Sequence, residues 1–536
     1  MKDISKAIRL TDFCGKDDSE IFANAIAYMR ANPGTTLVVE PRVYNITSEL
    51  ARNAQEQVMD GAYGEDPMVV MFKPDYTFTR GIHFDGLKDC RIEAYGATVM
   101  VDGFMEPISI TNCENTLVCG FAIDHKRKPY SKATVTQVED VPNSSEKKLY
   151  LEFDEAHPIK QNTPARLRYV LFNPATNALA WEDYIDEELY TYIDERHIIL
   201  IKDDGRFDVG SEFYTVHTYH SRPAVLIEYS CNITLQDISI HSQPGMGIVG
   251  NRSENITLNS VNIVPSDGHK ISTNTDATHF TSIKGKLIIE NYRFVGCGDD
   301  FTNVHGYYQK IIERVSPRIC YIQEKTPDGT HAQTLDYPDV GDVLELSDFR
   351  TLKTIDSFKV VDVEPLPNEW KCKVTLDHDL PDNTKNTVMC DVTRLPEVEI
   401  RGCYAANHYA RGAMIKTRCA IIEQNVFCNI DSTAIVVASE ASWYEGANPQ
   451  NIVIRNNVIT EDRSCDKVAG ISVRIKCDDP KGYPIKNVSI SNNVIHAPRC
   501  DHAIELKNID GVVLSNNKCT VQNDAVIIKN CTNIKL

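Results

Sequence analysis

Ile452-Val-Ile-Arg-Asn-Asn-Val-Ile459 is the clearest sign of the fold in this sequence. Apolar residues alternate along it, a polar group interrupts them, and an asparagine precedes the closing apolar pair. The same pattern returns at Ala420–Phe427, Val488–Ile495 and Val512–Cys519. A repeat of about 20 to 30 residues with alternating apolar positions is typical of stacked parallel strands. We therefore expect stacked, hydrogen-bonded side chains at the one register position that is shared by Asn425, Asn457, Asn493 and Asn517.

An earlier part of the chain carries the same rhythm without the asparagine. Ile233–Ile240 and Ile256–Ile263 are offset by 23 residues, and Leu287–Phe294 continues the series. We therefore predict an all-β chain folded as a right-handed parallel β-helix, a solenoid that grows along one axis. A β-sandwich array is the alternative, but it would not return asparagine to one register.

The N-terminal segment predicts a helix that would cap the open end of the solenoid. Asp17–Glu20 supplies residues that favour a helix start, and Phe22, Ile26 and Met29 recur at helical spacing before Asn32-Pro-Gly34. A solenoid needs such a cap because its terminal coil would otherwise expose apolar surface.

Two stretches break the repeat, at residues 131–224 and 307–395. Both carry longer strand-like runs, and we predict that each is an inserted small β-barrel or sandwich. Insertions map to one face of a solenoid, which is often the binding face. The other segments are 1–130, with the cap and first coils, 225–306, with the central coils and the catalytic residues, and 396–536, with the C-terminal coils.

The net charge bears on the class of partner, and the cysteines and apolar runs bear on the compartment. The net charge is -19 and lysine and arginine form no cluster, so neither nucleic acid nor a membrane surface is expected as a partner, and neutral sugars suit the chain better than polyanions. The 17 cysteines lack CxxC spacing and are typical of reduced core residues. No signal peptide or run of about 18 apolar residues occurs, which favours the cytoplasm; export with a removed leader is the alternative.

Acidic residues interrupt the apolar rhythm on two neighbouring coils. Asp276 lies within Lys270–Phe280, and Asp299 and Asp300 follow the next coil. Because Asp276 and Asp299 are 23 residues apart, we expect them on neighbouring rungs, where like charges raise at least one pKa. Glycoside hydrolysis uses such a set: one carboxyl protonates the leaving oxygen and another activates water or attacks the sugar. The alternative is that the aspartate pair caps a turn or binds calcium.

Further polar and aromatic residues are candidates for contact with a sugar. His279, Asn303 and His305 could bind hydroxyl groups or orient the acids, and Arg411 could bind a hydroxyl or pair with the aspartates. An aromatic pair beside acids at a strand end is a plausible sugar platform, although such a pair often only packs. That platform consists of Glu440, Trp443, Tyr444 and Glu445.

The region around the aspartates resembles a known family. Ser272-Thr273, Thr275-Asp-Ala-Thr-His-Phe280, Asp299-Asp300 and Asn303-Val-His-Gly306 are similar to glycoside hydrolase family 110, the α-1,3-galactosidases. This resemblance implies an inverting exo-enzyme that releases galactose from terminal α-1,3-linked galactosides without a metal or other cofactor. It implies that Asp276 is the general acid and that Asp299 and Asp300 hold the water. Lys270 and Thr273 complete the candidate substrate-binding residues.

Two other functions remain open from the residues. Paired aspartates on a β-helix also fit a polygalacturonase-like hydrolase or a lyase that acts on uronic acids. A non-enzymatic carbohydrate-binding protein of β-helical type is the other possibility. The exposed flank of a solenoid also offers a surface for a homo-oligomer.

Overall fold

The computed structural model describes residues 7–64, 67–73, 76–161, 168–182, 189–202, 205–323, 336–462 and 465–536. Nearly all of its regular structure is β. Strands pair in parallel with the equivalent strand of the next coil, as in β18 (Cys231–Gln236) and β21 (Glu254–Asn259), where Ile233 faces Ile256. The offset of 23 residues between these coils is therefore confirmed.

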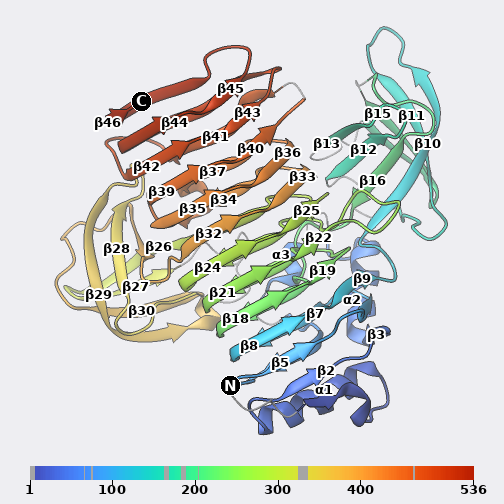
Figure 1. Ribbon diagram of the computed structural model, residues 1–536, viewed down its shortest axis with the longest axis horizontal. Helices are drawn as coiled ribbons and strands as arrows, with labels where there is room; N and C mark the ends of the chain where they lie inside the picture. Colours follow the sequence, from blue (N-terminus) through green and yellow to red (C-terminus); the bar gives the residue numbers. More distant parts are fainter. Residues whose placement is uncertain are drawn as a thin grey trace.

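Three parallel ladders form the walls of the coils (Figure 1). The first consists of β1 (Ala7–Arg9), β2 (Thr36–Val38), β5 (Arg91–Glu93), β8 (Glu114–Cys119), β18, β21, β24 (Lys284–Glu290), β32 (Glu397–Arg401), β35 (Cys419–Glu423), β39 (Gln450–Arg455), β42 (Ile485–Ser491), β44 (Cys500–Ser515) and β46 (Val526–Lys535). The second consists of β4 (Arg80–Asp85), β7 (Glu106–Thr111), β17 (Val225–Glu228), β20 (Ile248–Asn251), β23 (Thr278–Thr281), β26 (Thr302–Ser316), β34 (Ala413–Ile415), β37 (Ile435–Glu440) and β41 (Cys465–Lys476), which joins β44. The third consists of β3 (Val43–Thr47), β6 (Thr98–Asp102), β9 (Ala122–His125), β19 (Ser239–Ile240), β22 (Asn262–Ile263), β25 (Arg293–Val295), β33 (Tyr404–His408), β36 (Val426–Ile430), β40 (Val458–Thr460), β43 (Val494–His496) and β45 (Lys518–Thr520).

One continuous apolar core fills the interior of the coils, from Ile8 to Leu514. Alternation along each strand explains it, because every second side chain of a strand points to the same face. In β21, for example, Ile256 and Leu258 are fully buried while their neighbours are more exposed. The cysteines that the structure describes are all free thiols.

The predicted asparagine stack is confirmed. Asn425 donates through Nδ2 to Oδ1 of Asn457 at 3.0 Å, Asn457 to Asn493 at 2.9 Å, and Asn493 to Asn517 at 2.9 Å. The residue before each of the last three is also asparagine, with φ between 54° and 57°. Asparagine tolerates this left-handed conformation better than most residues, so one asparagine turns the chain while the next supports the stack.

We expect Asn457→Leu to lower the free energy of unfolding by about 3 kcal/mol or more. Asn457 is fully buried, and its loss removes partners from the side-chain and backbone amides of Asn425 and from the carbonyl of Ile422. Each buried polar group left without a partner costs about 1 to 3 kcal/mol. Denaturant unfolding measures the effect, and Asn517→Leu, at the half-buried end of the stack, should cost less. Equal losses in the two variants would contradict this role.

Helix α1 (Asp18–Ala31) lies at the N-terminal end of the stack (Figure 1). It begins after Asp17, whose side chain accepts from the backbone N–H of Glu20 at 2.9 Å. Its buried face includes Phe22, which contacts the rings of Tyr44 and Phe121 in the first coils. The helix predicted from residue 17 onward is therefore confirmed. Sequence reasoning missed α2 (Glu49–Met59), which Ser48 caps, and α3 (Met68–Met71).

The first interruption of the coils is a seven-stranded antiparallel sheet. Its edge strands β13 and β14 do not pair with each other, so the described sheet is not a closed barrel. Strand β13 packs instead against the coils, where Trp181 donates through Nε1 to the carbonyl of Asn407 at 3.3 Å. The sheet consists of β10 (Tyr130–Asp140), β11 (Lys147–Phe153), β12 (Tyr169–Asn173), β13 (Ala178–Glu182), β14 (Tyr190–Asp194), β15 (His197–Lys202) and β16 (Glu212–Val216).

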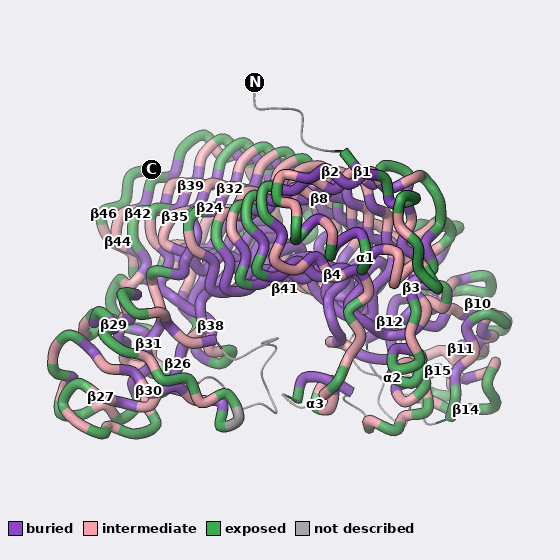
Figure 2. Tube along the Cα trace, turned by 90° about the horizontal axis from the view of Figure 1, so that it is seen from below, coloured by how far each residue is buried: buried purple, intermediate pink, exposed green. Residues whose placement is uncertain are grey.

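The second interruption is a closed antiparallel barrel and so departs from the β-helix. Strand β26 leaves the coils and pairs with both β27 and β31, which closes six strands into a ring. The other barrel strands are β27 (Ile319–Gln323), β28 (Val343–Asp348), β29 (Thr354–Leu366), β30 (Lys371–Leu376) and β31 (Thr387–Asp391). Figure 2 shows both inserted units on the same side of the stacked coils. No helix among the described residues is long and apolar enough to cross a membrane.

Candidate active site

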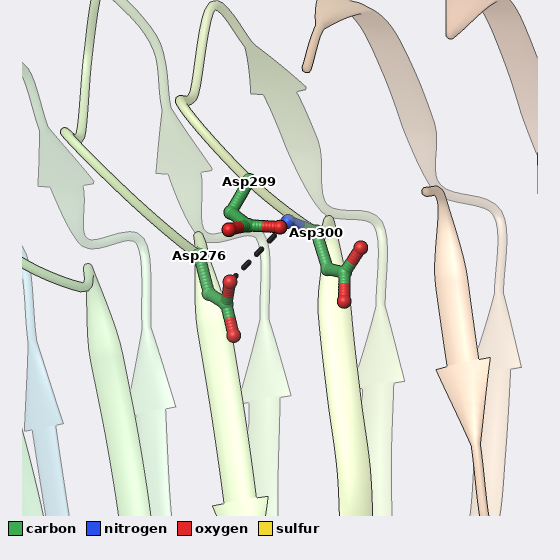
Figure 3. A group of neighbouring side chains, drawn as sticks. All are labelled: Asp276, Asp299 and Asp300. Carbon is green, nitrogen blue, oxygen red and sulfur yellow. Dashed lines mark hydrogen bonds between the residues drawn. The ribbon is translucent and has the colours of Figure 1, made fainter. Parts of the chain in front are cut away.

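Three aspartates lie where the chain enters two neighbouring strands of the second ladder. Asp276 precedes β23, and Asp299 and Asp300 precede β26 (Figure 3). Thr278 of β23 faces Thr302 of β26, so the rung partner of Asp276 is Asp300. Asp276 and Asp299 do lie on neighbouring rungs as expected, but their offset of 23 residues is one short of the register, which matches Asp276 with Asp300. The coil from β23 to β26 is 24 residues long, one more than the coil from β18 to β21, because the lengths of the turns differ between coils.

The three carboxyl groups form one cluster. Their nearest oxygens lie within 4.8 Å of one another, and the backbone N–H of Asp300 donates to Oδ1 of Asp276 at 3.3 Å (Figure 3). Asp276 and Asp300 are only 5% and 1% exposed, whereas the side chain of Asp299 is 25% exposed. Burial, and then the charge of Asp300, raise the pKa of Asp276 well above its usual value. Asp276 thus favours its protonated form more strongly than Asp300 does.

Arg411 holds Asp300 in place from the next rung. Its backbone N–H and Nε donate to Oδ1 of Asp300 at 2.9 and 2.8 Å, and Nη2 donates to Oδ2 at 2.8 Å. Burial raises the pKa of Asp300 to about 6 although Arg411 opposes the rise. Of the two roles expected for Arg411, the ion pair is the one that the structure contains.

Two buried histidines form a line of contacts that begins at Asp276. Nδ1 of His279 lies 2.7 Å from Oδ2 of Asp276, and Nε2 of His279 lies 2.8 Å from Nε2 of His305. The rings meet edge to face, with centroids 4.9 Å apart. Burial lowers the pKa of His279 to about 4 and that of His305 to about 3, so both rings favour the neutral form.

A buried lysine that sequence reasoning missed joins the acids of the predicted sugar platform. Lys416 is fully buried, and its Nζ lies 2.6 Å from Oε2 of Glu445 and 3.5 Å from Oε2 of Glu440. The ammonium also donates to Oδ1 of Asn303 at 3.1 Å. Burial raises the pKa of Glu445, but the charge of Lys416 outweighs burial and brings that pKa below its usual value. A lysine just after a short apolar strand gives no sequence signal of burial.

Arg168 reaches the cluster from the first inserted sheet. Its Nη1 lies 3.3 Å from Oδ2 of Asp299. The guanidinium stacks over the ring of Tyr409 at 4.0 Å and of Tyr219 at 4.7 Å, so aromatic faces hold it toward the acid. Sequence reasoning missed Arg168 because it lies in an insertion far from the aspartates along the chain.

Four predicted substrate-binding residues are not brought together with the aspartates. The ammonium of Lys270 lies 3.9 Å from the ring centroid of Phe172 and lines a separate cavity of about 1110 Å³. The hydroxyl of Thr273 donates to the carbonyl of Thr275 at 2.8 Å and so supports the turn before Asp276. The remaining two are the aromatic pair: Tyr444 packs on Phe349 with centroids 5.0 Å apart, and Trp443 is 44% exposed. His279, Asn303, His305, Arg411, Glu440 and Glu445 do gather with the acids.

The three aspartates also meet the distance requirement for a cation site. Two of the three aspartates already have cationic partners, however. Arg411 engages both oxygens of Asp300, and Arg168 engages Asp299. Two fixed guanidinium groups therefore balance the charge that a divalent ion would otherwise balance, and we do not assign these residues as metal ligands.

Comparison with known proteins agrees with the resemblance read from the sequence. An α-1,3-galactosidase B of Bacteroides thetaiotaomicron is 25% identical over 553 residues, which cover 96% of this chain and 86% of that protein. An α-1,3-galactosidase A of Bacteroides fragilis is 27% identical over 452 residues, which cover 80% of this chain and 71% of that protein. No protein-family model matches the chain.

Solved structures give only distant likenesses. The A-module of a mannuronan C-5 epimerase from Azotobacter vinelandii has a TM-score of 0.40 and 9% identity and covers 97% of both chains. A family 28 exopolygalacturonase from Yersinia enterocolitica has a TM-score of 0.40 and 10% identity and covers 98% of this chain and 76% of that one. The sequence relatives are more informative: the resemblance predicted above is confirmed, and the chain is a glycosidase related to the α-1,3-galactosidases.

Proposed function

We propose that this protein is an exo-acting glycosidase that releases galactose from terminal α-1,3-linked galactosides with inversion. The observation that carries the proposal is a buried Asp276 that favours its protonated form, directly beside the arginine-bound Asp300. A proton donor and a fixed carboxylate side by side are what acid–base hydrolysis of a glycosidic bond requires. The named relatives supply the galactose and the α-1,3 linkage.

Asp276 is proposed to be the general acid. Its carboxyl gives its proton to the glycosidic oxygen as the bond to the anomeric carbon breaks. Asp299 and Asp300 are proposed to hold the water that attacks from the opposite face. Water gives one proton to this carboxylate side and its oxygen to the sugar, so the products are free galactose and the shortened acceptor.

The separation of the carboxyl groups bears on whether hydrolysis inverts or retains the anomeric configuration. Inverting carboxyl pairs usually stand about 6.5 to 9.5 Å apart and retaining pairs about 5 to 5.5 Å, and the nearest oxygens here lie within 4.8 Å. Separation alone would therefore favour retention. Retention needs a carboxylate free to attack carbon, however, and both oxygens of Asp300 are bound by Arg411. We infer inversion from this clamp and from the sequence resemblance to glycoside hydrolase family 110.

The sugar itself is proposed to bind beside Lys416. Asn303, Glu440 and Glu445 surround this ammonium with buried donors and acceptors, which suit the hydroxyl groups of a neutral hexose. Arg168 reaches the acids from the inserted sheet, and Glu445 reaches them from the coil segment that pairs with β26 at Tyr307, where β26 continues toward the barrel. A site enclosed from these two directions would admit a chain end more readily than the middle of a polymer.

The handedness of the coil and the capping role of α1 are also proposed. We infer that the coil is right-handed, because crossovers between parallel strands are right-handed in nearly all proteins. We also infer that α1 is the N-terminal cap, because it buries Phe22 against the first coils.

A panel of glycosides tests the proposal. We expect galactose from linear α-1,3-linked and branched blood-group B caps, and little from α-1,4-linked, α-1,6-linked or β-linked galactosides. Products from polygalacturonate, with or without the absorbance of an unsaturated uronate, would favour the uronate-active alternatives instead. Binding of these sugars with no turnover of any of them would favour a carbohydrate-binding protein and contradict the proposal.

A further inference from the structure

A line of short hydrogen bonds connects Asp276 to the backbone through two histidine rings. From Oδ2 of Asp276 the contacts run to Nδ1 of His279 at 2.7 Å and from Nε2 of His279 to Nε2 of His305 at 2.8 Å. The line ends at the carbonyl oxygen of Gly306, 3.1 Å from Nδ1 of His305. A neutral imidazole carries a hydrogen on only one of its two ring nitrogens. The partner at one end of the line therefore fixes which nitrogen carries the hydrogen in each ring.

The hydrogens can be placed in order from the backbone end. A carbonyl oxygen only accepts, so Nδ1 of His305 carries the hydrogen and its Nε2 is bare. The hydrogen between the two rings must then lie on Nε2 of His279. Nδ1 of His279 is therefore bare, and the hydrogen in its contact with Asp276 must belong to the carboxyl group.

The opposite arrangement is disfavoured. If the hydrogens of Asp276 and His279 each moved one step while Nδ1 of His305 kept its own, Asp276 would be ionised and His305 would be an imidazolium, with Nε2 lying 3.6 Å from Oε1 of Glu445. Glu445 is already neutralised by Lys416. Burial also lowers the pKa of both rings, so a charged imidazole is costly here.

We propose that His279 and His305 are positioning residues that keep the proton on Asp276, with the Gly306 carbonyl fixing the ring tautomers. This inference rests on the proposed function, in which Asp276 is the acid. Neither ring needs to touch the substrate for the effect. The charged and titratable groups that face Asp276 and the two rings are Cys297, Asp299, Asp300, Tyr307, Arg411, Lys416, Glu440 and Glu445.

His305→Leu and His305→Gln together test the inference. Leucine removes the bare acceptor nitrogen, so His279 can carry its hydrogen on Nδ1 and donate it to an ionised Asp276. A hydrogen bond to the charged form lowers a carboxyl pKa, and we expect the alkaline limb of the kcat/KM profile to move down by about one pH unit or more. Glutamine offers an amide oxygen as acceptor, and the limb should stay near its wild-type position.

His125→Gln is the matched control for loss of a buried histidine. His125 is equally buried, and its Nδ1 contacts Ser242 on another part of the coils. We expect it to affect stability but not the pH limb. A purely structural role for His305 would lower the rate in the leucine variant without moving the limb, and that result would overturn the inference.

Nitrogen-15 NMR of histidine in the wild-type protein gives a second answer that needs neither turnover nor a folded variant. We expect neutral rings, with the hydrogen of His305 on Nδ1 and that of His279 on Nε2. A charged ring or the reversed tautomers would overturn the inference. Wild-type inactivity on every α-galactoside would instead contradict the proposed function, while the NMR result would still decide the tautomers.

Discussion

Asp276→Asn is expected to lower kcat/KM on α-1,3-linked galactosides by about 10²- to 10⁴-fold, the usual contribution of a general acid. The variant should remain folded. An asparagine amide can donate to Nδ1 of His279 as the protonated carboxyl does, and one buried acidic group next to Asp300 is removed. Initial rates of galactose release measure the effect. Asp124→Asn, in strand β9 and paired with Lys128, is the control and should keep full activity.

Substrates with different leaving groups distinguish the role of Asp276 from the roles of Asp299 and Asp300. A nitrophenyl α-galactoside needs little protonation of its leaving oxygen, so Asp276→Asn should lose much less activity on it than on a disaccharide. Asp300→Asn should lose activity on both. If Asp299→Asn, not Asp276→Asn, spares the nitrophenyl substrate, the roles are exchanged. Asp276 and Asp300, which share a rung position, would then hold the water, and Asp299 would donate the proton.

Lys416→Met is expected to destabilise the fold by about 3 to 5 kcal/mol, the usual cost of removing one partner from a buried ion pair. Its ammonium is fully buried between Glu440, which is 2% exposed, and Glu445, which is 10% exposed. Methionine keeps the side-chain length but leaves both carboxylates without this cation. Lys88→Met, which breaks an exposed pair with Glu114, should change stability little.

The pH dependence of the Lys416→Met effect has a definite sign. In the wild type the pKa of Glu445 lies below its unfolded value because Lys416 outweighs burial, so its contribution is present above that unfolded value and is lost as the pH falls. Without Lys416, burial raises the pKa of Glu445, and stability is lost as the pH rises through the raised value. The difference in unfolding free energy should therefore shrink in mild acid. A difference independent of pH would contradict the assigned ion pair.

The coils could be predicted because their pattern is local. Alternating apolar residues and the asparagine at 457 and its equivalents recur at coil length, and hydrogen bonds along the stack need that regularity. The helix after Asp17 was predictable for the same reason, since its cap and apolar face lie close together in the sequence. Ser48 carries a similar cap signal for α2, which was overlooked.

The candidate site could be predicted only in part. The aspartates were found because they break the repeat, but the rung partner of Asp276 depends on turn length, which the pattern does not encode. Lys416 and Arg168 come from segments distant in sequence, and only the folded chain brings them to the acids. Trp443 and Tyr444 form the aromatic pair expected of a sugar platform, but Trp443 is 44% exposed and Tyr444 packs on Phe349, whereas the neighbouring Glu440 and Glu445 gather with the acids.

Proton NMR of the first sugar released from a terminal α-1,3-linked galactoside tests the proposed mechanism most directly. The wild-type protein is predicted to release β-galactose first, with the α-anomer appearing only as mutarotation proceeds. Release of α-galactose first would contradict inversion and indicate that a carboxylate attacks the sugar. Release of no galactose would contradict the assignment of the three-aspartate cluster as an α-1,3-galactosidase site.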